Sequence, residues 1–201
     1  MIDFSLMSKC AIIVVVAAIF LAGCKSTSRS GIIQPSDETA AAGELVLEAN
    51  DDLKQIKKLY DDNEGKRSDL KKALEANDAV EVKKIADDVV YIINDGFDFG
   101  NSAVDKIGRA QEMNINPDYK EYLRLKEEAL RKQMAAFEEY RQAARSLRDN
   151  YDPKDAQRRD KVKADFKQRS ESYASIMEKA RALSNEANDI AKAALRKQRD
   201  Q

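Results

Sequence analysis

The chain has 201 residues, enough for one domain with a substantial core, and its 35 basic and 36 acidic residues leave a net charge of −1. It contains no His, so the commonest general base and the commonest metal ligand are missing. Charged residues make up 35% of the chain, hydrophobic residues 43% and aromatic residues 6%, which is typical of long helices around an aliphatic core. Composition therefore favours an all-α protein and argues against histidine-dependent catalysis.

The first 24 residues have the order of an export signal. Lys9 precedes an apolar block from Cys10 to Ala22. As a helix this block would be about 20 Å long, well short of the roughly 30 Å hydrocarbon core of a bilayer, so a signal peptide fits better than a membrane span. The residues that end the block, Leu21-Ala22-Gly23-Cys24, closely resemble the lipobox of bacterial lipoproteins.

This resemblance implies cleavage between Gly23 and Cys24, a diacylglycerol thioether on Cys24, and acylation of its amine. Two or three acyl chains together hold a protein stably on a bilayer. Lys25 is not the Asp that typically retains lipoproteins in the inner membrane, so the periplasmic face of the outer membrane is favoured if the organism has two membranes. The alternatives are an ordinary secretory signal and a short amphiphilic tail.

The segment 24–35 is expected to be a flexible tether behind the lipidated Cys24. It contains three serines and ends at Pro35. As a flexible coil it would span roughly 20 Å, enough to hold a folded body just clear of the lipid headgroups. A helical domain is expected from residue 36 to residue 201.

The first helix of that domain is expected over about 36–76. Ser36 can cap its first turn, and an apolar line continues past the polar run 61–68 in the same heptad phase. Gly65 weakens the helix, and a break there with a new cap at Ser68 is the alternative.

Two further helices are expected over about 78–113 and 117–148. Asp78 has the spacing of a capping residue for the earlier one, and Pro117 can begin the later one. On the later helix, pairs spaced four residues apart should form ion pairs on the solvated face. These pairs are Glu127 with Arg131 and Glu128 with Lys132.

The last and longest helix is expected over about 152–198, starting at Asp152-Pro153. Its seam positions alternate spacings of four and three, which indicates coiled-coil-like packing. Those positions are Val162, Phe166, Arg169, Tyr173, Ile176, Ala180, Leu183, Ala187, Ile190 and Ala194. Four helices joined by short turns predict an antiparallel up-down four-helix bundle. An extended coiled-coil dimer is the alternative, and the oligomeric state stays open.

An irregular segment in the second expected helix holds two glycines, each of which costs about 1 kcal/mol relative to Ala. Gly100 falls on the core line, where it would allow close approach of another helix; Gly96 lies four residues earlier. Tight packing is one explanation. The other is a kink that presents Phe97 and Phe99 to a partner.

Charge is unevenly distributed along the chain. Residues 36–116 carry 19 acidic and 11 basic residues, whereas residues 153–201 carry 8 acidic and 13 basic. In an antiparallel bundle the last helix ends beside the lipid anchor, so Arg196, Lys197 and Arg199 would face a membrane surface that is often anionic. Cations also suit a helix C-terminus, and the opposite charges also fit pairing between the first and last helices.

No phosphate loop, nucleophile elbow, zinc motif or calcium loop is found, so neither a cofactor nor a metal is expected. An envelope location and a slightly acidic chain argue against nucleic acid. The sequence therefore favours a lipid-anchored, non-catalytic scaffold that binds an envelope protein. The alternative is a ligand-binding or chaperone-like lipoprotein. A cavity near Gly96 and Gly100 would favour this alternative, with Gln133 and Arg169 as the first candidates to line it.

Overall fold

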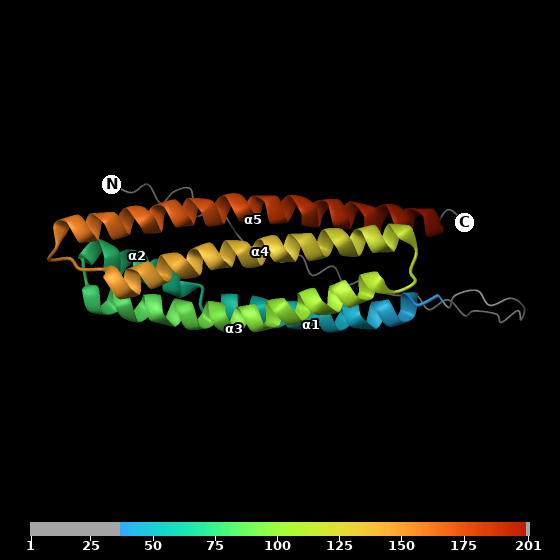
Figure 1. The fold of residues 1–201 in the computed structure, drawn as a ribbon, viewed down its shortest axis with the longest axis horizontal. Coiled ribbons are helices and arrows are strands. Elements are labelled where there is room, and N and C mark those ends of the chain that lie inside the picture. Colours follow the sequence, from blue (N-terminus) through green and yellow to red (C-terminus); the bar gives the residue numbers. More distant parts are fainter. Residues whose placement is uncertain (1–36, 200–201) are drawn as a thin grey trace, which may run out of the picture.

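The computed structural model describes residues 37–199, so Cys24, the tether and Ser36 lie outside the described part of the chain. Within it the chain forms five helices and no strand. They are α1 (Thr39–Asp62), α2 (Gly65–Ala76), α3 (Ala79–Glu112), α4 (Pro117–Asn150) and α5 (Ala156–Arg199), as Figure 1 shows. The predicted all-α antiparallel bundle is confirmed, with α1 and α2 together forming one arm.

The first arm is interrupted, and the prediction of one continuous helix is wrong at Asn63-Glu64. The backbone N–H of Asn63 donates to the carbonyl of Tyr60 at 3.1 Å, and its side-chain Nδ2 donates to the carbonyl of Leu59 at 2.8 Å. These bonds satisfy carbonyl groups that the end of α1 would otherwise leave unpaired. A new cap at Ser68 is wrong as well, because α2 already begins at Gly65.

Short polar side chains set the other helix boundaries. Asp78 accepts hydrogen bonds from the backbone N–H groups of Val80 and Glu81, each at 3.0 Å, and so caps α3. Asn116 caps α4 by accepting from the N–H of Tyr119 at 2.8 Å. The last helix begins later than expected, at Ala156, because Asp155 rather than Asp152 provides its cap, with Oδ1 accepting from the N–H of Arg158 at 3.0 Å.

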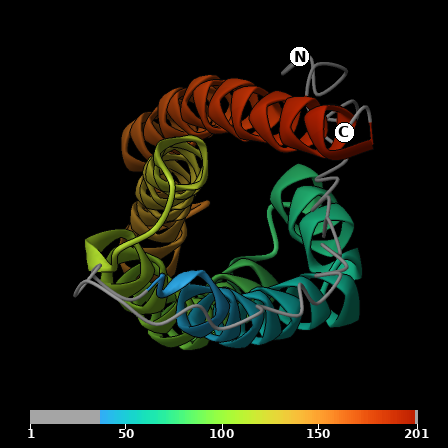
Figure 2. The same ribbon diagram turned by 90° about the vertical axis from the view of Figure 1, so that its right-hand side faces the viewer.

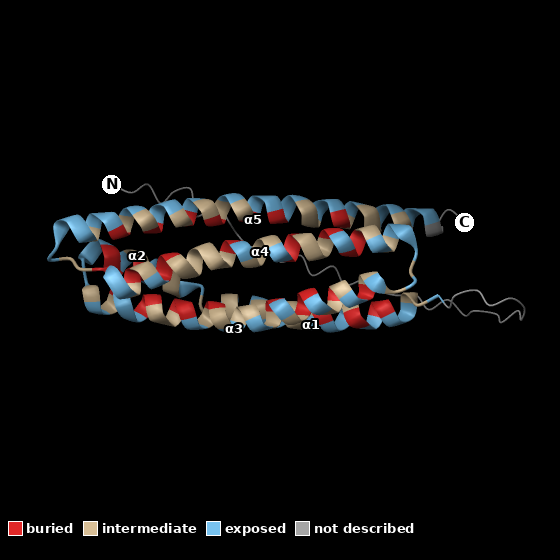
Figure 3. Ribbon diagram, viewed as in Figure 1, coloured by how far each residue is buried: buried red, intermediate tan, exposed pale blue. Residues whose placement is uncertain are grey.

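The buried side chains form two main clusters, one towards each end of the bundle, and Figure 3 shows them on the inward faces of the helices. The cluster at the end where α2 turns into α3 includes Leu74, Val82, Leu147 and Phe166. The cluster at the opposite end includes Leu45, Ile107, Leu123 and Ala187. All buried apolar residues described lie between Ala42 and Ala187, so the core that the structure describes falls within residues 25–201.

The helices pack in chain order, and one side of the bundle is less closed than the others. Helix α5 packs along α4, α4 along α3, and α3 along α1 and α2; within residues 37–199, α5 shares no comparable interface with the first arm. Figure 2 shows this arrangement along the bundle axis. At one end Lys163 of α5 reaches across and donates to the carbonyl of Leu74 at 3.1 Å.

Helix α5 therefore has a narrower buried stripe than its sequence suggested. Of the expected seam, Val162, Phe166, Tyr173, Ala180 and Ala187 are buried. Arg169 and Ile176 are only half-buried, and their neighbours Ser170 and Met177 are buried instead. The single stripe that α5 buries thus departs from the regular four-and-three spacing in the middle of the helix, which packs mainly against α4.

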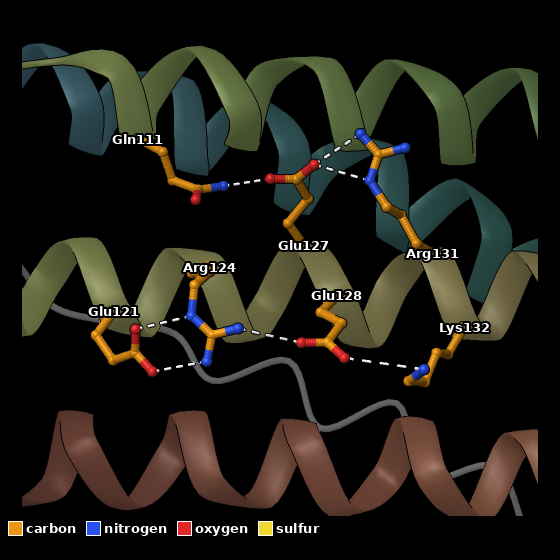
Figure 4. A network of polar contacts seen from close by, with 7 residues as sticks. All are labelled: Gln111, Glu121, Arg124, Glu127, Glu128, Arg131 and Lys132. Carbon is orange, nitrogen blue, oxygen red and sulfur yellow. Dashed lines mark hydrogen bonds and ion pairs between the residues drawn. The ribbon is translucent and has the colours of Figure 1, made fainter.

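The solvated face of α4 carries the two ion pairs that were predicted. Arg131 Nη2 lies 2.7 Å from Glu127 Oε1, and Lys132 Nζ lies 3.8 Å from Glu128 Oε1. Figure 4 shows both pairs within longer chains, in which Gln111 of α3 donates to Glu127, and Arg124 joins Glu121 to Glu128. Ion pairs on an exposed helix surface contribute little to the stability of a protein, so we assign this network no large part in holding the bundle together.

Candidate functional site

A cavity of about 120 Å³ lies in the middle of the bundle, and all five helices contribute to its walls. Most of its lining is apolar. The apolar and aromatic members are Ile56, Leu59, Tyr60, Val89, Ile92, Ile93, Gly96, Phe97, Leu130, Met134, Phe137, Tyr140 and Tyr173; the polar ones are Asn63, Glu64, Lys66, Arg67 and Gln133. For comparison, an engineered apolar cavity of about 150 Å³ binds benzene.

The position of the cavity follows from the fold. It lies beside the interruption at Asn63-Glu64, where the first arm changes from α1 to α2. It also lies where α5 and the first arm share no long interface. Several of its apolar side chains, including Ile56, Leu59 and Met134, are only half-buried because no side chain fills the space between them.

The two glycines of α3 have different surroundings. A Cβ on Gly100 would lie 3.1 Å from the Sδ of Met134, so this glycine does allow close approach of α4. A Cβ on Gly96 would meet nothing within 4 Å. Val89, Ile93 and Gly96 share one face of α3 and all line the cavity. Gly96 therefore leaves space in the cavity and does not serve tight packing.

Four aromatic rings pack together where α4 meets α5, and three of them, Phe137, Tyr140 and Tyr173, line the cavity. The ring centroid of Tyr140 lies 5.7 Å from that of Tyr173 and 6.1 Å from that of Phe166, and Phe137 lies 5.9 Å from Tyr173. These tilted pairs are a favourable arrangement for aromatic side chains. They hold the phenol groups of Tyr140 and Tyr173 at the cavity.

The half-buried guanidinium of Arg67 joins these phenols from the opposite wall. It lines the cavity together with Tyr60 and Tyr140, and its charge interacts with their hydroxyl groups. Burial acts to lower the pKa of Arg67, but interactions with Tyr140, Tyr173 and Tyr60 outweigh it and raise that pKa above its ordinary value. Burial also raises the pKa of Tyr140, against the opposing effect of the Arg67 charge. The cavity thus contains a permanent cation among neutral hydroxyl groups.

Sequence reasoning missed Arg67, although the sequence contains a signal for it. Arg67 lies seven residues after Tyr60 and seven before Leu74, on the heptad line that continues from α1 into α2. A charged residue at such a core position must form an ion pair, reach solvent or bind a ligand. The prediction instead followed the apolar line past the polar run 61–68 and did not consider the charged residue on that line.

The other expected site residues are dispersed. Gln133 lines the cavity, but Arg169 does not: it binds Glu139 and Asp165, each at 3.1 Å, at the interface of α5 with α4. Phe97 lines the cavity, and the guanidinium of Arg141 lies 4.6 Å from its ring centroid. Phe99 is half-buried and belongs neither to the cavity nor to the core clusters, and α3 is one uninterrupted helix through this segment.

The basic end of α5 lies at the same end of the bundle as the start of α1, as Figure 1 shows. Lys197 Nζ lies 3.3 Å from Asp118 Oδ2 at the start of α4, so part of its charge is neutralised within the chain. Arg196 is exposed, and the side chain of Arg199 is not described. That these cations face a membrane stays a prediction. Gly23 and Cys24 lie outside the described residues.

Two searches of residues 37–199 gave negative results. None of the described helices is long and apolar enough to cross a membrane, and no group of three or more described His, Cys, Asp or Glu residues could hold a metal ion. No protein-family model, curated protein or solved structure matches this chain. The cavity and the residues that line it are therefore the features of this structure that bear on its function.

Proposed function

We propose that this protein is a lipid-anchored protein of the cell envelope that binds a small molecule with a largely apolar body in the central cavity of its helical bundle. The observation that carries the proposal is the cavity itself, which lies at Gly96 and is lined mainly by apolar and aromatic side chains. Ligand sites in proteins are typically concave and mostly apolar, with a few polar groups that orient the ligand.

The energetics of a space that the protein's own side chains leave open support the same function. Apolar side chains around such a space forgo contacts that a packed core would give them, which lowers the stability of the protein. A ligand that occupies the space restores those contacts and stabilises the folded state by mass action. Gly96 adds to this argument, because a larger residue there would have closed the space and favoured the helix.

A scaffold that binds an envelope protein, the function favoured by the sequence alone, has less support. The large apolar side chains that are exposed among the described residues are Leu47, Val80 and Tyr91. Leu47 is on α1, and the two others are eleven residues apart on α3. Single apolar residues of this kind are normal on a protein surface, whereas partner sites usually present a contiguous patch.

The proposed activity is tested by calorimetric titration of residues 25–201 with 1-octanol, a neutral single-chain probe. We expect saturable binding of about one molecule per chain with a negative heat-capacity change, because apolar surface leaves water. The midpoint of thermal unfolding, followed by circular dichroism, should rise with octanol concentration. Heat that grows linearly without saturation, together with an unchanged midpoint, would show that the cavity is not a binding site.

The proposed anchor is tested separately with Cys24→Ala in the full chain. If Cys24 is the lipidated residue, the variant should accumulate as an unprocessed precursor and incorporate no radiolabelled palmitate. The unchanged chain provides the control, since its label should follow the membrane fraction. Label retained by the variant would disprove lipidation at Cys24 without bearing on the cavity.

A further inference from the structure

Arg67 is the charged group of the cavity whose charge the fold leaves uncompensated. Among the described residues no carboxylate forms an ion pair with it, and the groups beside it in the cavity lining are the neutral hydroxyls of Tyr60 and Tyr140. Hydroxyl groups satisfy the N–H donors of a guanidinium but do not balance its charge. A half-buried cation in such a place is unfavourable unless an anion joins it.

The other charged groups of the lining do not supply that anion. Lys66 is compensated by Asp88, whose Oδ2 lies 2.6 Å from Lys66 Nζ. Glu64 also lines the cavity, but it is exposed and forms no ion pair with Arg67. Arg67 and Lys66 both lie in the first turn of α2, where the helix dipole already favours a negative charge over a positive one. The local potential thus favours an incoming anion.

We propose that the ligand of this cavity is a single-chain anionic amphiphile, whose negatively charged head binds Arg67 and the phenols beside it while its alkyl chain lies among the apolar residues of α1, α3 and α4. This inference rests on the proposed function and adds the chemical class of the ligand. The planar guanidinium fits the two oxygen atoms of a carboxylate or a phosphate equally, so the chemistry shared by the candidates is an oxyanion on an alkyl chain.

The arrangement of the cavity fits such a molecule at both ends. The hydroxyls of Tyr60 and Tyr140, which line the cavity with Arg67, can donate to an oxyanion that binds the guanidinium. The apolar walls, which include Ile56, Ile93 and Met134, offer nothing to a second charge. A dianion without a chain would leave these walls unfilled, and a neutral chain would leave Arg67 uncompensated.

The test compares octanoate with 1-octanol by calorimetry on residues 25–201 at neutral pH, where both probes have the same chain length and differ in the charged head. We expect octanoate to bind about tenfold more tightly than octanol, as a charge-assisted hydrogen bond would give. In Arg67→Gln this preference should vanish while octanol still binds, which also shows that the variant is folded. Arg67→Lys should keep part of the preference, and the exposed Arg181→Gln should keep all of it.

Two further ligands distinguish the sources of the oxyanion. Octyl phosphate should bind at least as tightly as octanoate, whereas inorganic phosphate alone should bind far more weakly. Equal affinity of octanol and octanoate in the unchanged protein would overturn the inference and leave the apolar site intact. Tight binding of inorganic phosphate would overturn it by showing that the chain of the ligand is not recognised. Failure of octanol to bind at all would instead refute the proposed function.

Discussion

Gly96→Leu should abolish octanol binding without unfolding the protein. A Cβ at this position meets nothing within 4 Å, so the new side chain has space to enter and will occupy the volume that the ligand needs. We expect octanol affinity to fall about 30-fold or more, because the apolar contacts of the ligand are taken over by the protein. The free energy of unfolding should rise by about 1 kcal/mol, since leucine favours the helix over glycine.

The matched control is Gly108→Leu, the same substitution on the same helix. A Cβ on Gly108 also meets nothing within 4 Å, but this residue does not line the cavity. This variant should gain helix stability and bind octanol as the unchanged protein does. If Gly96→Leu and Gly108→Leu bound octanol equally well, the ligand would have to lie elsewhere.

Leu147→Ala should destabilise the protein by about 2 to 5 kcal/mol, the usual cost of truncating a fully buried leucine. Leu147 has no exposed surface and lies in the core cluster at the end where α2 turns into α3. That cluster joins α2, α3, α4 and α5, so the truncation weakens the contacts that hold these four helices together at that end of the bundle. Urea unfolding followed by circular dichroism at the helix band measures the effect, because the chain has no Trp.

Leu47→Ala is the control for this substitution, because the side chain of Leu47 is 53% exposed on α1. Its effect should stay within about 0.5 kcal/mol, as is usual for surface residues. A small effect of Leu147→Ala, equal to that of Leu47→Ala, would mean that the end cluster does not hold the bundle together.

The sequence predicted those parts of the fold that depend on neighbouring residues. Asp78 caps α3 as its spacing from Glu81 indicated, and the pairs of Glu127 with Arg131 and Glu128 with Lys132 formed as predicted. Caps and pairs four residues apart depend only on local helix geometry. The start of α5 was misplaced for the same reason, since Asp152 and Asp155 are both competent caps and the turn selects the second.

The cavity could be anticipated only in part. The glycines marked the correct segment of α3, but the sequence could not show that Gly100 meets Met134 while Gly96 meets open space. That difference depends on where α4 lies relative to α3. The proximity of Arg67 to Tyr140 and Tyr173 likewise depends on how α2, α4 and α5 are placed relative to one another. The sequence does not show this placement, so Arg67 looked like one more residue of a polar run.

The proposed anchor precedes the end of the bundle at which α1 begins, and this placement relates the cavity to the membrane. The start of α1 and the end of α5 lie at one end of the bundle, and the cavity lies midway along it. If Cys24 is lipidated and residues 24–35 form the expected flexible tether of roughly 20 Å, the cavity stays close to the membrane. A site for a single-chain amphiphile at that position would let the protein accept or deliver such molecules at the membrane surface.

The most direct measurement is a crystal structure of residues 25–201 with 11-bromoundecanoate, located by the anomalous signal of bromine. We predict a bromine peak inside the cavity, among the apolar walls that include Ile93 and Met134, with the carboxylate on Arg67. Gly96→Leu crystals soaked in the same way should lack the peak. Bromine found only on the outer surface, or equally in both crystals, would contradict a binding site in the bundle.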